Sequence, residues 1–220
     1  MNIIGICRFS LVGRGDWKAF RGTTDEEADA ISRENAKSLF TAERMEARLK
    51  TFELLTLASI RAQTDQDFKF LVLSSELMPE EYKVRLQALC DTVPQVILRF
   101  FPIATIRDAQ RAVCKEFGID YASTLQFRLD DDDCVCDDFI AQMRAETSAK
   151  MQGDSIFVVS VRGVMYSSMK GTQDGVYDWP VDFLGVGAGI RHPAKASTSL
   201  AILAWQRGFP MWSSRTVFRL

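Results

Sequence analysis

Short apolar runs alternate with longer segments of helical periodicity over the first 130 residues, and this alternation restricts the fold more than any other feature of the chain. Strands are predicted at 2–9, 68–74, 95–101 and 124–129. Helices are predicted at 41–63, 78–89 and 106–117. Strands separated by helices of this length pair in parallel, because the helix carries the chain back across the sheet. The sequence therefore predicts a Rossmann-like α/β fold, with a mostly parallel sheet and helices on both faces.

The rest of the chain has weaker signals. A helix at 137–150 and a strand at 155–161 are predicted after the fourth strand. The segment 165–193 contains five glycines, so we expect loops there, and loops often carry binding sites. A last helix is predicted at 197–207. The polar stretch 23–37 has no apolar periodicity, and no element is predicted in it.

Composition narrows the class of protein. With 220 residues, of which 47% are hydrophobic, we expect a single globular domain over 1–220. The 27 basic and 29 acidic side chains nearly cancel, which argues against a nucleic-acid partner. No apolar run approaches the roughly 18 residues that span a bilayer, so no transmembrane segment and a cytoplasmic location are expected. Five scattered cysteines predict reduced thiols and no disulfide framework.

Four consecutive aspartates, Asp130, Asp131, Asp132 and Asp133, directly follow the predicted strand 124–129. Ligands of open α/β sheets bind at the carboxyl ends of the strands. If the period of two continued, Asp130 and Asp132 would point one way and Asp131 and Asp133 the other. Carboxylates select hard cations, and Mg²⁺ is usually held by one or two carboxylates plus substrate phosphates. The run predicts a metal-bound phosphate ester; the alternative is a solvated acidic turn.

The segment 128–133 (RLDDDD) resembles the Asp-x-Asp motif of glycosyltransferases with the A-type fold. The segments 48–53 (RLKTFE), 59–68 (SIRAQTDQDF) and 71–75 (LVLSS) are similar to the family described as putative rhamnosyltransferases. Together with 8–10 (RFS), the resemblance covers roughly residues 1 to 140.

This resemblance implies a metal-dependent glycosyltransferase that moves a sugar from a nucleotide-diphosphate sugar to a saccharide or related acceptor. Rhamnose from dTDP-rhamnose, with inversion, is the first expectation. Residues 1–133 would form the nucleotide-sugar-binding half and 134–220 the acceptor-side half. Mn²⁺ or Mg²⁺ would bridge the pyrophosphate to the protein. The metal ligands expected are Asp130, Asp132, Asp133 and His192.

Further residues are expected around the donor and the acceptor. Donor contacts are expected from Arg8, Ser10, Arg128, Asp131 and Arg191. Arg128 has an equally simple alternative, an ion pair that orients the aspartates. An inverting transfer needs a general base. The candidates are Asp182, which we rank first because it precedes the 185–189 turn, then Asp178 and Asp174; each could equally be a turn residue. Tyr177, Trp179 and Phe183 lie among them and could stack on sugar rings.

Two other functions remain open at this point. Gly13 and Gly15 follow the first strand, and a phosphate-binding loop there would favour a nucleotidyltransferase of related fold. A non-catalytic module that binds a nucleotide or a metal is the other possibility, because a fold does not guarantee an activity.

Overall fold

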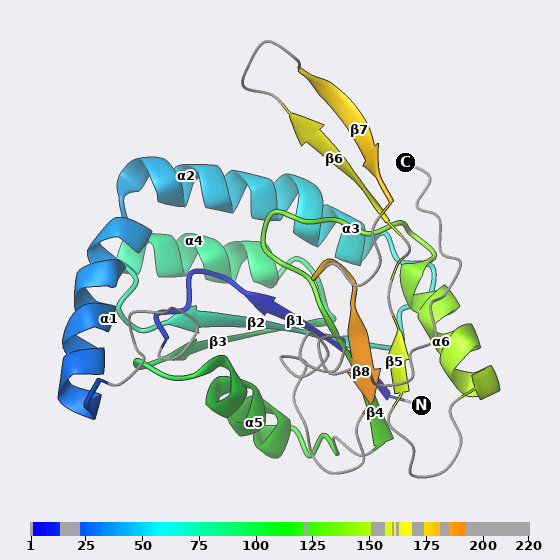
Figure 1. Ribbon diagram of the computed structural model, residues 1–220, viewed down its shortest axis with the longest axis horizontal. Helices are drawn as coiled ribbons and strands as arrows, with labels where there is room; N and C mark the ends of the chain where they lie inside the picture. Colours follow the sequence, from blue (N-terminus) through cyan, green and yellow to red (C-terminus); the bar gives the residue numbers. More distant parts are fainter. Residues whose placement is uncertain are drawn as a thin grey trace.

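The computed structural model describes residues 2–13, 23–120, 123–150, 157–159, 161, 163–168, 174–180 and 185–191 (Figure 1). A six-stranded sheet has the order β3-β2-β1-β4-β8-β5. Its strands are β1 (Asn2–Arg8), β2 (Lys69–Ser75), β3 (Val96–Phe101), β4 (Thr124–Arg128), β5 (Phe157–Val159) and β8 (Gly189–Arg191). The first four are mutually parallel, and β8 runs antiparallel to both of its neighbours. The predicted α/β fold with a mostly parallel sheet is confirmed.

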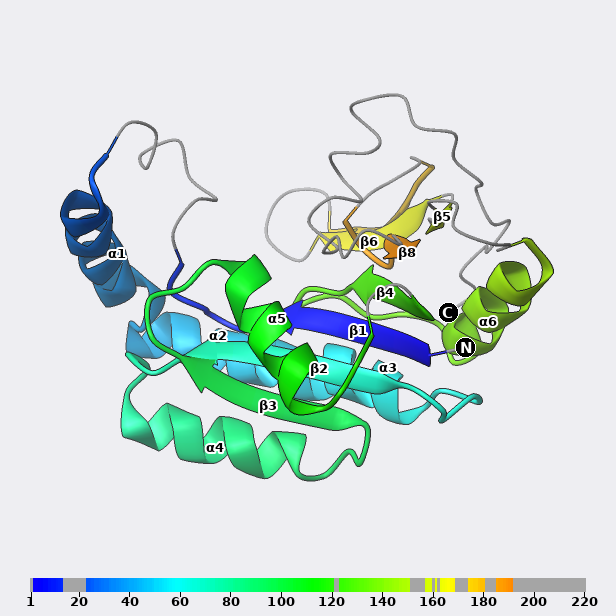
Figure 2. The same cartoon turned by 90° about the horizontal axis from the view of Figure 1, so that it is seen from below.

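Helices cover both faces of this sheet (Figure 2). They are α1 (Asp25–Leu39), α2 (Ala42–Thr51), the π-helical segment η2 (Phe52–Leu57), α3 (Ala58–Arg61), α4 (Glu80–Cys90), α5 (Ile106–Glu116) and α6 (Phe139–Lys150). Side chains along β1 point alternately to the two faces of the sheet, and so contribute to two separate core clusters. Ile3 and Cys7 pack in the cluster that includes residues of α2, η2 and α4. Ile4 and Ile6 pack on the opposite face, where α5 lies. Within the described residues, no helix is both long and apolar enough to cross a membrane.

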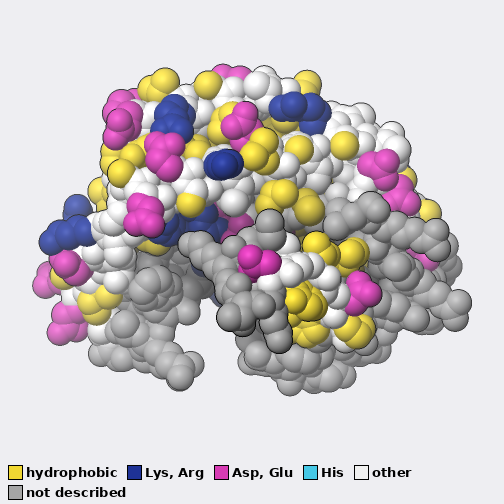
Figure 3. Space-filling model, turned by 90° about the horizontal axis from the view of Figure 1, so that it is seen from above, with side chains coloured by type: hydrophobic (Ala, Val, Ile, Leu, Met, Phe, Trp, Pro, Cys, Tyr) yellow, Lys and Arg dark blue, Asp and Glu magenta, His cyan; other side chains and the backbone are white. Residues whose placement is uncertain are grey.

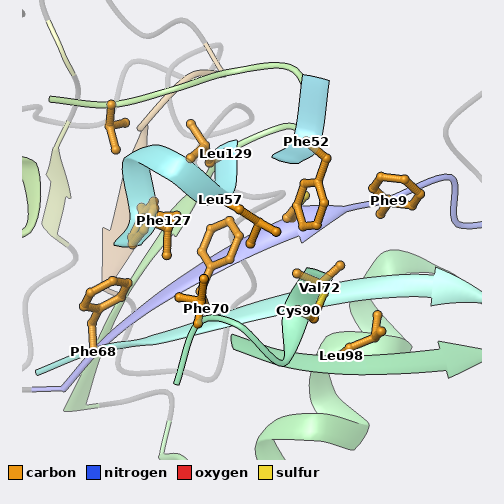
Figure 4. Packing of buried hydrophobic residues seen from close by; sticks show 14 of the residues in the cluster. Phe9, Phe52, Leu57, Phe68, Phe70, Val72, Cys90, Leu98, Phe127 and Leu129 are labelled. Carbon is orange, nitrogen blue, oxygen red and sulfur yellow. The ribbon is translucent and has the colours of Figure 1, made fainter. Parts of the chain in front are cut away.

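The larger cluster centres on aromatic rings above the middle strands (Figure 4). Phe127 of β4 is fully buried, with its ring centroid 6.3 Å from that of Phe70 and 5.2 Å from that of Phe139. Gly5 of β1 lies beside the rings of Phe70 and Phe127. A methyl group on Gly5 would be 2.4 Å from Cδ2 of Phe70 and 2.5 Å from Cζ of Phe127. The strand therefore requires glycine at this position, because the two rings occupy the space of a side chain.

The structure corrects two expectations. The polar stretch 23–37, where no element was predicted, contains helix α1, which begins with a capping box: Thr24 accepts from the Glu27 amide and Glu27 accepts from the Thr24 amide. The segment 165–193, predicted to consist of loops, contains most of the hairpin β6 (Val164–Ser168) and β7 (Gly175–Trp179), as well as β8. The predicted helix at 197–207 lies outside the described residues.

Candidate functional site

The acidic run forms a turn at the end of β4. The chain leaves the strand after Arg128, and the Asp133 amide donates to the Asp130 carbonyl over 3.2 Å. The prediction that alternate aspartates point in opposite directions is therefore wrong, because strand geometry ends before the run begins. A single nitrogen of Arg48, Nη1, lies 2.8 Å from Oδ1 of Asp131 and 2.8 Å from Oδ2 of Asp132. Neighbouring aspartates thus converge on one arginine.

This turn forms one wall of a pocket of about 230 Å³ at the carboxyl ends of β1 and β4. The other walls come from the end of β1 and its following loop, from α1, from α2 and from the start of α5. The lining residues are Arg8, Ser10, Leu11, Val12, Gly13, Ser32, Asn35, Leu39, Arg44, Arg48, Ile106, Asp130, Asp131 and Asp132. Figure 3, which looks onto α2 from above, shows Lys and Arg side chains at the edge of a hollow. The pocket combines three arginines with three aspartates.

Arg8 and Ser10, expected near the donor, both line the pocket. Ser10 has φ of 48°, in the left-handed region that non-glycine residues rarely adopt, and such a conformation costs on the order of 1 kcal/mol. Arg44 holds it there: Nη1 donates to Oγ of Ser10 over 2.9 Å and to the Leu39 carbonyl over 2.8 Å. The end of β1 is therefore fixed to the start of α2 across the pocket.

Arg128 forms a two-point ion pair with Asp130. Its Nε lies 3.1 Å from Oδ1 and its Nη2 lies 2.6 Å from Oδ2. The ion pair that the alternative for Arg128 expects is present, with Asp130 as the partner. The loop before β8 passes beside the pair, since the Gly187 amide donates to the Arg128 carbonyl over 2.8 Å.

The helical segment from α2 through η2 holds the backbone of the acidic turn. Thr51 donates its hydroxyl to the Asp131 carbonyl over 3.4 Å. Thr56, fully buried in η2, donates to the Asp133 carbonyl over 2.8 Å and to the Asp130 carbonyl over 3.3 Å. A π-helix turns less per residue than an α-helix, so it brings positions five apart closer to one face. The π-helical turn therefore allows both threonines to reach the same loop.

Replacing Thr56 by Val is expected to lower the free energy of unfolding by about 1–3 kcal/mol, because two partly buried carbonyls lose their hydroxyl donor while the side-chain shape is kept. Urea denaturation of the variant and the parent measures the difference. Thr56→Ser, which keeps the hydroxyl, is the control and should lose less. A Thr56→Val variant as stable as the parent would contradict the role assigned to this side chain.

Burial and mutual repulsion shape the charges of the turn. Burial first, and then the neighbouring aspartates, raise the pKa of Asp131 to about 6 against the opposing effect of Arg48. The pKa of Asp133 is also raised to about 6, by burial and then by Asp130 and Asp132. Beneath the turn, burial and then the charge of Asp131 raise the pKa of the Cys7 thiol well above its usual range. The turn thus carries more negative charge than its surroundings readily accept.

The residues present fit a hard divalent cation. Arg48 contacts Asp131 and Asp132, and Arg128 pairs with Asp130, so two guanidinium groups are in direct contact with three carboxylates of the turn. Oδ2 of Asp131 is buried and has no hydrogen-bond partner in the described part of the chain. No three His, Cys, Asp or Glu side chains of that part are arranged as a complete metal site. Mg²⁺ and Mn²⁺ sites of this kind take their remaining oxygens from a substrate phosphate.

Several predicted residues lie elsewhere. Asp174 precedes β7 and Asp178 lies within it; both are exposed, and neither lines the pocket. Arg191 ends β8, one residue beyond Ile190, which pairs with Gln126, so the structure does not bring Arg191 to the acidic turn. Asp182 and His192 are outside the described residues, and so is Phe183.

The hairpin carries an aromatic cluster. The rings of Tyr166 and Tyr177 stack at 5.4 Å between centroids, and Trp179 lies edge-on to Tyr166 at 6.1 Å. All three are substantially exposed. Tyr177 and Trp179, expected to stack on a sugar, therefore present aromatic surface to solvent, although they do not line the pocket.

Sequence reasoning missed the two side chains of α2 that line the pocket, Arg44 and Arg48. Arg44 and Arg48 are four residues apart, so they share one face of a helix. This spacing could have identified them as a pair. Ser10, the partner of Arg44, is 34 residues away in the sequence, and Asp131, a partner of Arg48, is 83 residues away. Hydrophobic periodicity is a local signal and cannot predict contacts over such separations.

Comparison with known families agrees with this arrangement. A family model described as putative rhamnosyl transferase matches residues 2–208, which includes β1, α2, the acidic turn and the hairpin. No curated protein matches the sequence. The match covers most of the 220 residues, so the family supports glycosyl transfer as the general activity of the chain. The chain belongs to the putative rhamnosyl transferase family.

Proposed function

We propose that this protein is a metal-dependent glycosyltransferase that uses a nucleotide-diphosphate sugar and a saccharide or related acceptor. The observation that carries the proposal is the pocket, where Arg8, Arg44 and Arg48 lie with three aspartates at the carboxyl ends of β1 and β4. Basic and acidic groups in one pocket suit a diphosphate that is bound both directly and through a cation.

The chemistry of sugar transfer explains why both kinds of side chain are needed. The bond from the anomeric carbon to the diphosphate oxygen breaks, so negative charge develops on the leaving diphosphate. Arginines bind that charge through planar, multidentate hydrogen bonds. A Mn²⁺ or Mg²⁺ ion, if bound, would supply further neutralisation of that charge. Asp130, Asp132 and Asp133 are the proposed ligands, and Asp131, through Arg48, helps to orient them.

The acceptor side of the proposal rests on the second half of the chain. The family name supports rhamnose as the transferred sugar, and dTDP-rhamnose as the donor remains our proposal. The general base is proposed among Asp182, Asp178 and Asp174, and His192 and Arg191 are proposed as further metal and phosphate contacts. The exposed aromatic cluster of the hairpin supports an acceptor with sugar rings.

A thermal-shift panel tests the proposal. The protein is heated with dTDP, UDP, GDP and the corresponding triphosphates, each with Mn²⁺ or with a chelator. A ligand at one hundred times its Kd stabilises the native state by about 2.7 kcal/mol. For a chain of this size, that corresponds to a rise in Tm of roughly 5–10 °C. We expect such a rise with dTDP and Mn²⁺, and little with the chelator.

Other outcomes of the panel identify the alternatives. Preference for a triphosphate, with release of pyrophosphate on turnover, would indicate a nucleotidyltransferase. A diphosphate-dependent rise with no consumption of any nucleotide sugar would indicate a binding module. No rise with any nucleotide would contradict the assignment of the pocket.

A further inference from the structure

We infer that Arg48 is an internal counterion: it neutralises the acidic turn when no ligand is bound, and a nucleoside diphosphate must draw it away before a divalent cation binds tightly. The inference rests on the proposed function and deepens it, because it makes metal binding conditional on the donor. Nothing in the family match assigns a role to this residue.

The contact geometry places a positive group between two carboxylates. Nη1 of Arg48 is 2.8 Å from Oδ1 of Asp131 and equally far from Oδ2 of Asp132. A cation bound to Oδ2 of Asp132, one of the proposed ligands, would compete with this guanidinium for the same oxygen. The Asp131 side chain is only 7% exposed, whereas that of Arg48 is 30% exposed and lines the pocket. A ligand in the pocket can therefore reach the guanidinium without unfolding the turn.

Arg44, one helical turn earlier, is held differently. Its named hydrogen bonds go to neutral oxygens, the Ser10 hydroxyl and the Leu39 carbonyl. Arg44 therefore keeps its position when an anion arrives, while Arg48 exchanges two carboxylate partners for phosphate oxygens. The diphosphate thus attracts both arginines, and the exchange leaves Asp132, one of the proposed ligands, available to a cation.

This exchange has a thermodynamic consequence. If the diphosphate removes a group that competes with the cation, each ligand raises the affinity of the other by the same factor. Replacing Arg48 should weaken this mutual enhancement. The nucleotide-free variant should bind the cation more tightly than the nucleotide-free parent, and the nucleotide should increase that affinity by a smaller factor than in the parent. If Arg48 only bound phosphate, replacing it would not change the affinity of the nucleotide-free protein for the cation.

The experiment measures Mn²⁺ binding to the full chain by isothermal titration calorimetry, first without and then with dTDP. The parent is compared with Arg48→Gln, Arg48→Lys and Arg44→Gln. We expect Arg48→Gln to bind Mn²⁺ alone about tenfold more tightly than the parent, a change within the usual range of such coupling. Arg48→Lys, which keeps the charge, should lie between them. Arg44→Gln also removes a positive charge and controls for long-range electrostatics; its gain should be about threefold or less.

The outcomes separate the inference from the proposed function. Three results would overturn the inference. The first is that Arg48→Gln binds Mn²⁺ no more tightly than the parent, and the second is that the nucleotide-free parent already binds Mn²⁺ tightly. The third is that neither protein binds Mn²⁺. If dTDP and Mn²⁺ still bind together to the parent in the first two cases, the proposed function stands without it. If Arg48→Gln gains affinity and no nucleotide binds, the counterion role stands and the nucleotide assignment fails. Should Arg48→Gln not fold, the comparison of Arg48→Lys with the parent decides, and an unchanged affinity overturns the inference.

Discussion

Replacing Asp132 by Asn is expected to reduce sugar transfer by about 10²–10³-fold, the range found when one group that stabilises developing charge is removed. The amide keeps the shape of the side chain and loses the charge that would bind the cation. The Asp132 side chain is 49% exposed, and exposed ion pairs contribute about 0–1 kcal/mol to stability, so the free energy of unfolding should change little. Initial rates of transfer and urea denaturation of the same preparation measure the two effects.

Asp137→Asn is the matched control, because Asp137 is an exposed aspartate of the same loop and does not line the pocket. It should retain the activity of the parent. The metal-dependent rise in Tm with dTDP should disappear in Asp132→Asn and persist in Asp137→Asn. Full activity of Asp132→Asn would show that the acidic turn is structural, and the proposed metal site would then be wrong.

Replacing Phe127 by Ala is expected to lower the free energy of unfolding by about 3–5 kcal/mol, as for other fully buried aromatic side chains. The ring is completely buried between Phe70 and Phe139, and its removal leaves a cavity in the largest core cluster. For a chain of this length the corresponding fall in Tm is about 6–20 °C. Urea denaturation gives the free energy directly.

A conservative variant and a second site sharpen this test. Phe127→Leu should lose less than Phe127→Ala, because it leaves a smaller cavity. Gly5→Ala should also destabilise, since its methyl group meets the Phe127 and Phe70 rings. With Phe127→Ala in the same chain, the Gly5→Ala effect should shrink by about 0.5 kcal/mol or more, because residues in contact are not additive. Strict additivity would contradict the packing described.

The elements predicted best are those whose burial follows a simple period. The predicted strand 68–74 and helix 106–117 correspond to β2 and α5 within a residue or so, because apolar side chains mark the faces that pack on the sheet. Helix α1 was missed because the residues it buries, Ala28, Ser32 and Ala36, are small and weakly apolar. Its capping box at Thr24 was a local signal independent of hydrophobicity.

Glycine content misled the prediction for the second half of the chain. The strands β6 and β7 contain Val164, Tyr166, Val176 and Tyr177, residue types that favour strands, while Gly175 lies opposite Ser168 in the pairing. The glycines of this segment favoured loops in the prediction, although these β-branched and aromatic residues favour strands. Cross-strand packing of the tyrosines supports a hairpin that composition alone did not indicate.

The candidate site could be predicted only in part. Asp130 and Asp132 stand out because a strand followed by acidic residues is a local pattern, whereas Arg8 and Ser10 were expected there from the family resemblance; all four line the pocket. The contribution of α1 and α2 depends on how helices dock across the sheet. Arg48 meets the aspartates only because α2 lies over the end of β4, and no local pattern reports such docking.

The hydrogen bonds from Thr51 and Thr56 join parts of the chain that are 74–80 residues apart. Contacts of such separation form late in folding, because long loops must close before any of them is made. On the ribosome, where the chain grows by about 5–20 residues per second, β1 and α2 emerge several seconds before β4. Until β4 has been made, the ends of β1 and α2 lack the wall that completes the pocket, so the pocket of a newly made chain forms only after β4 and the acidic turn have emerged.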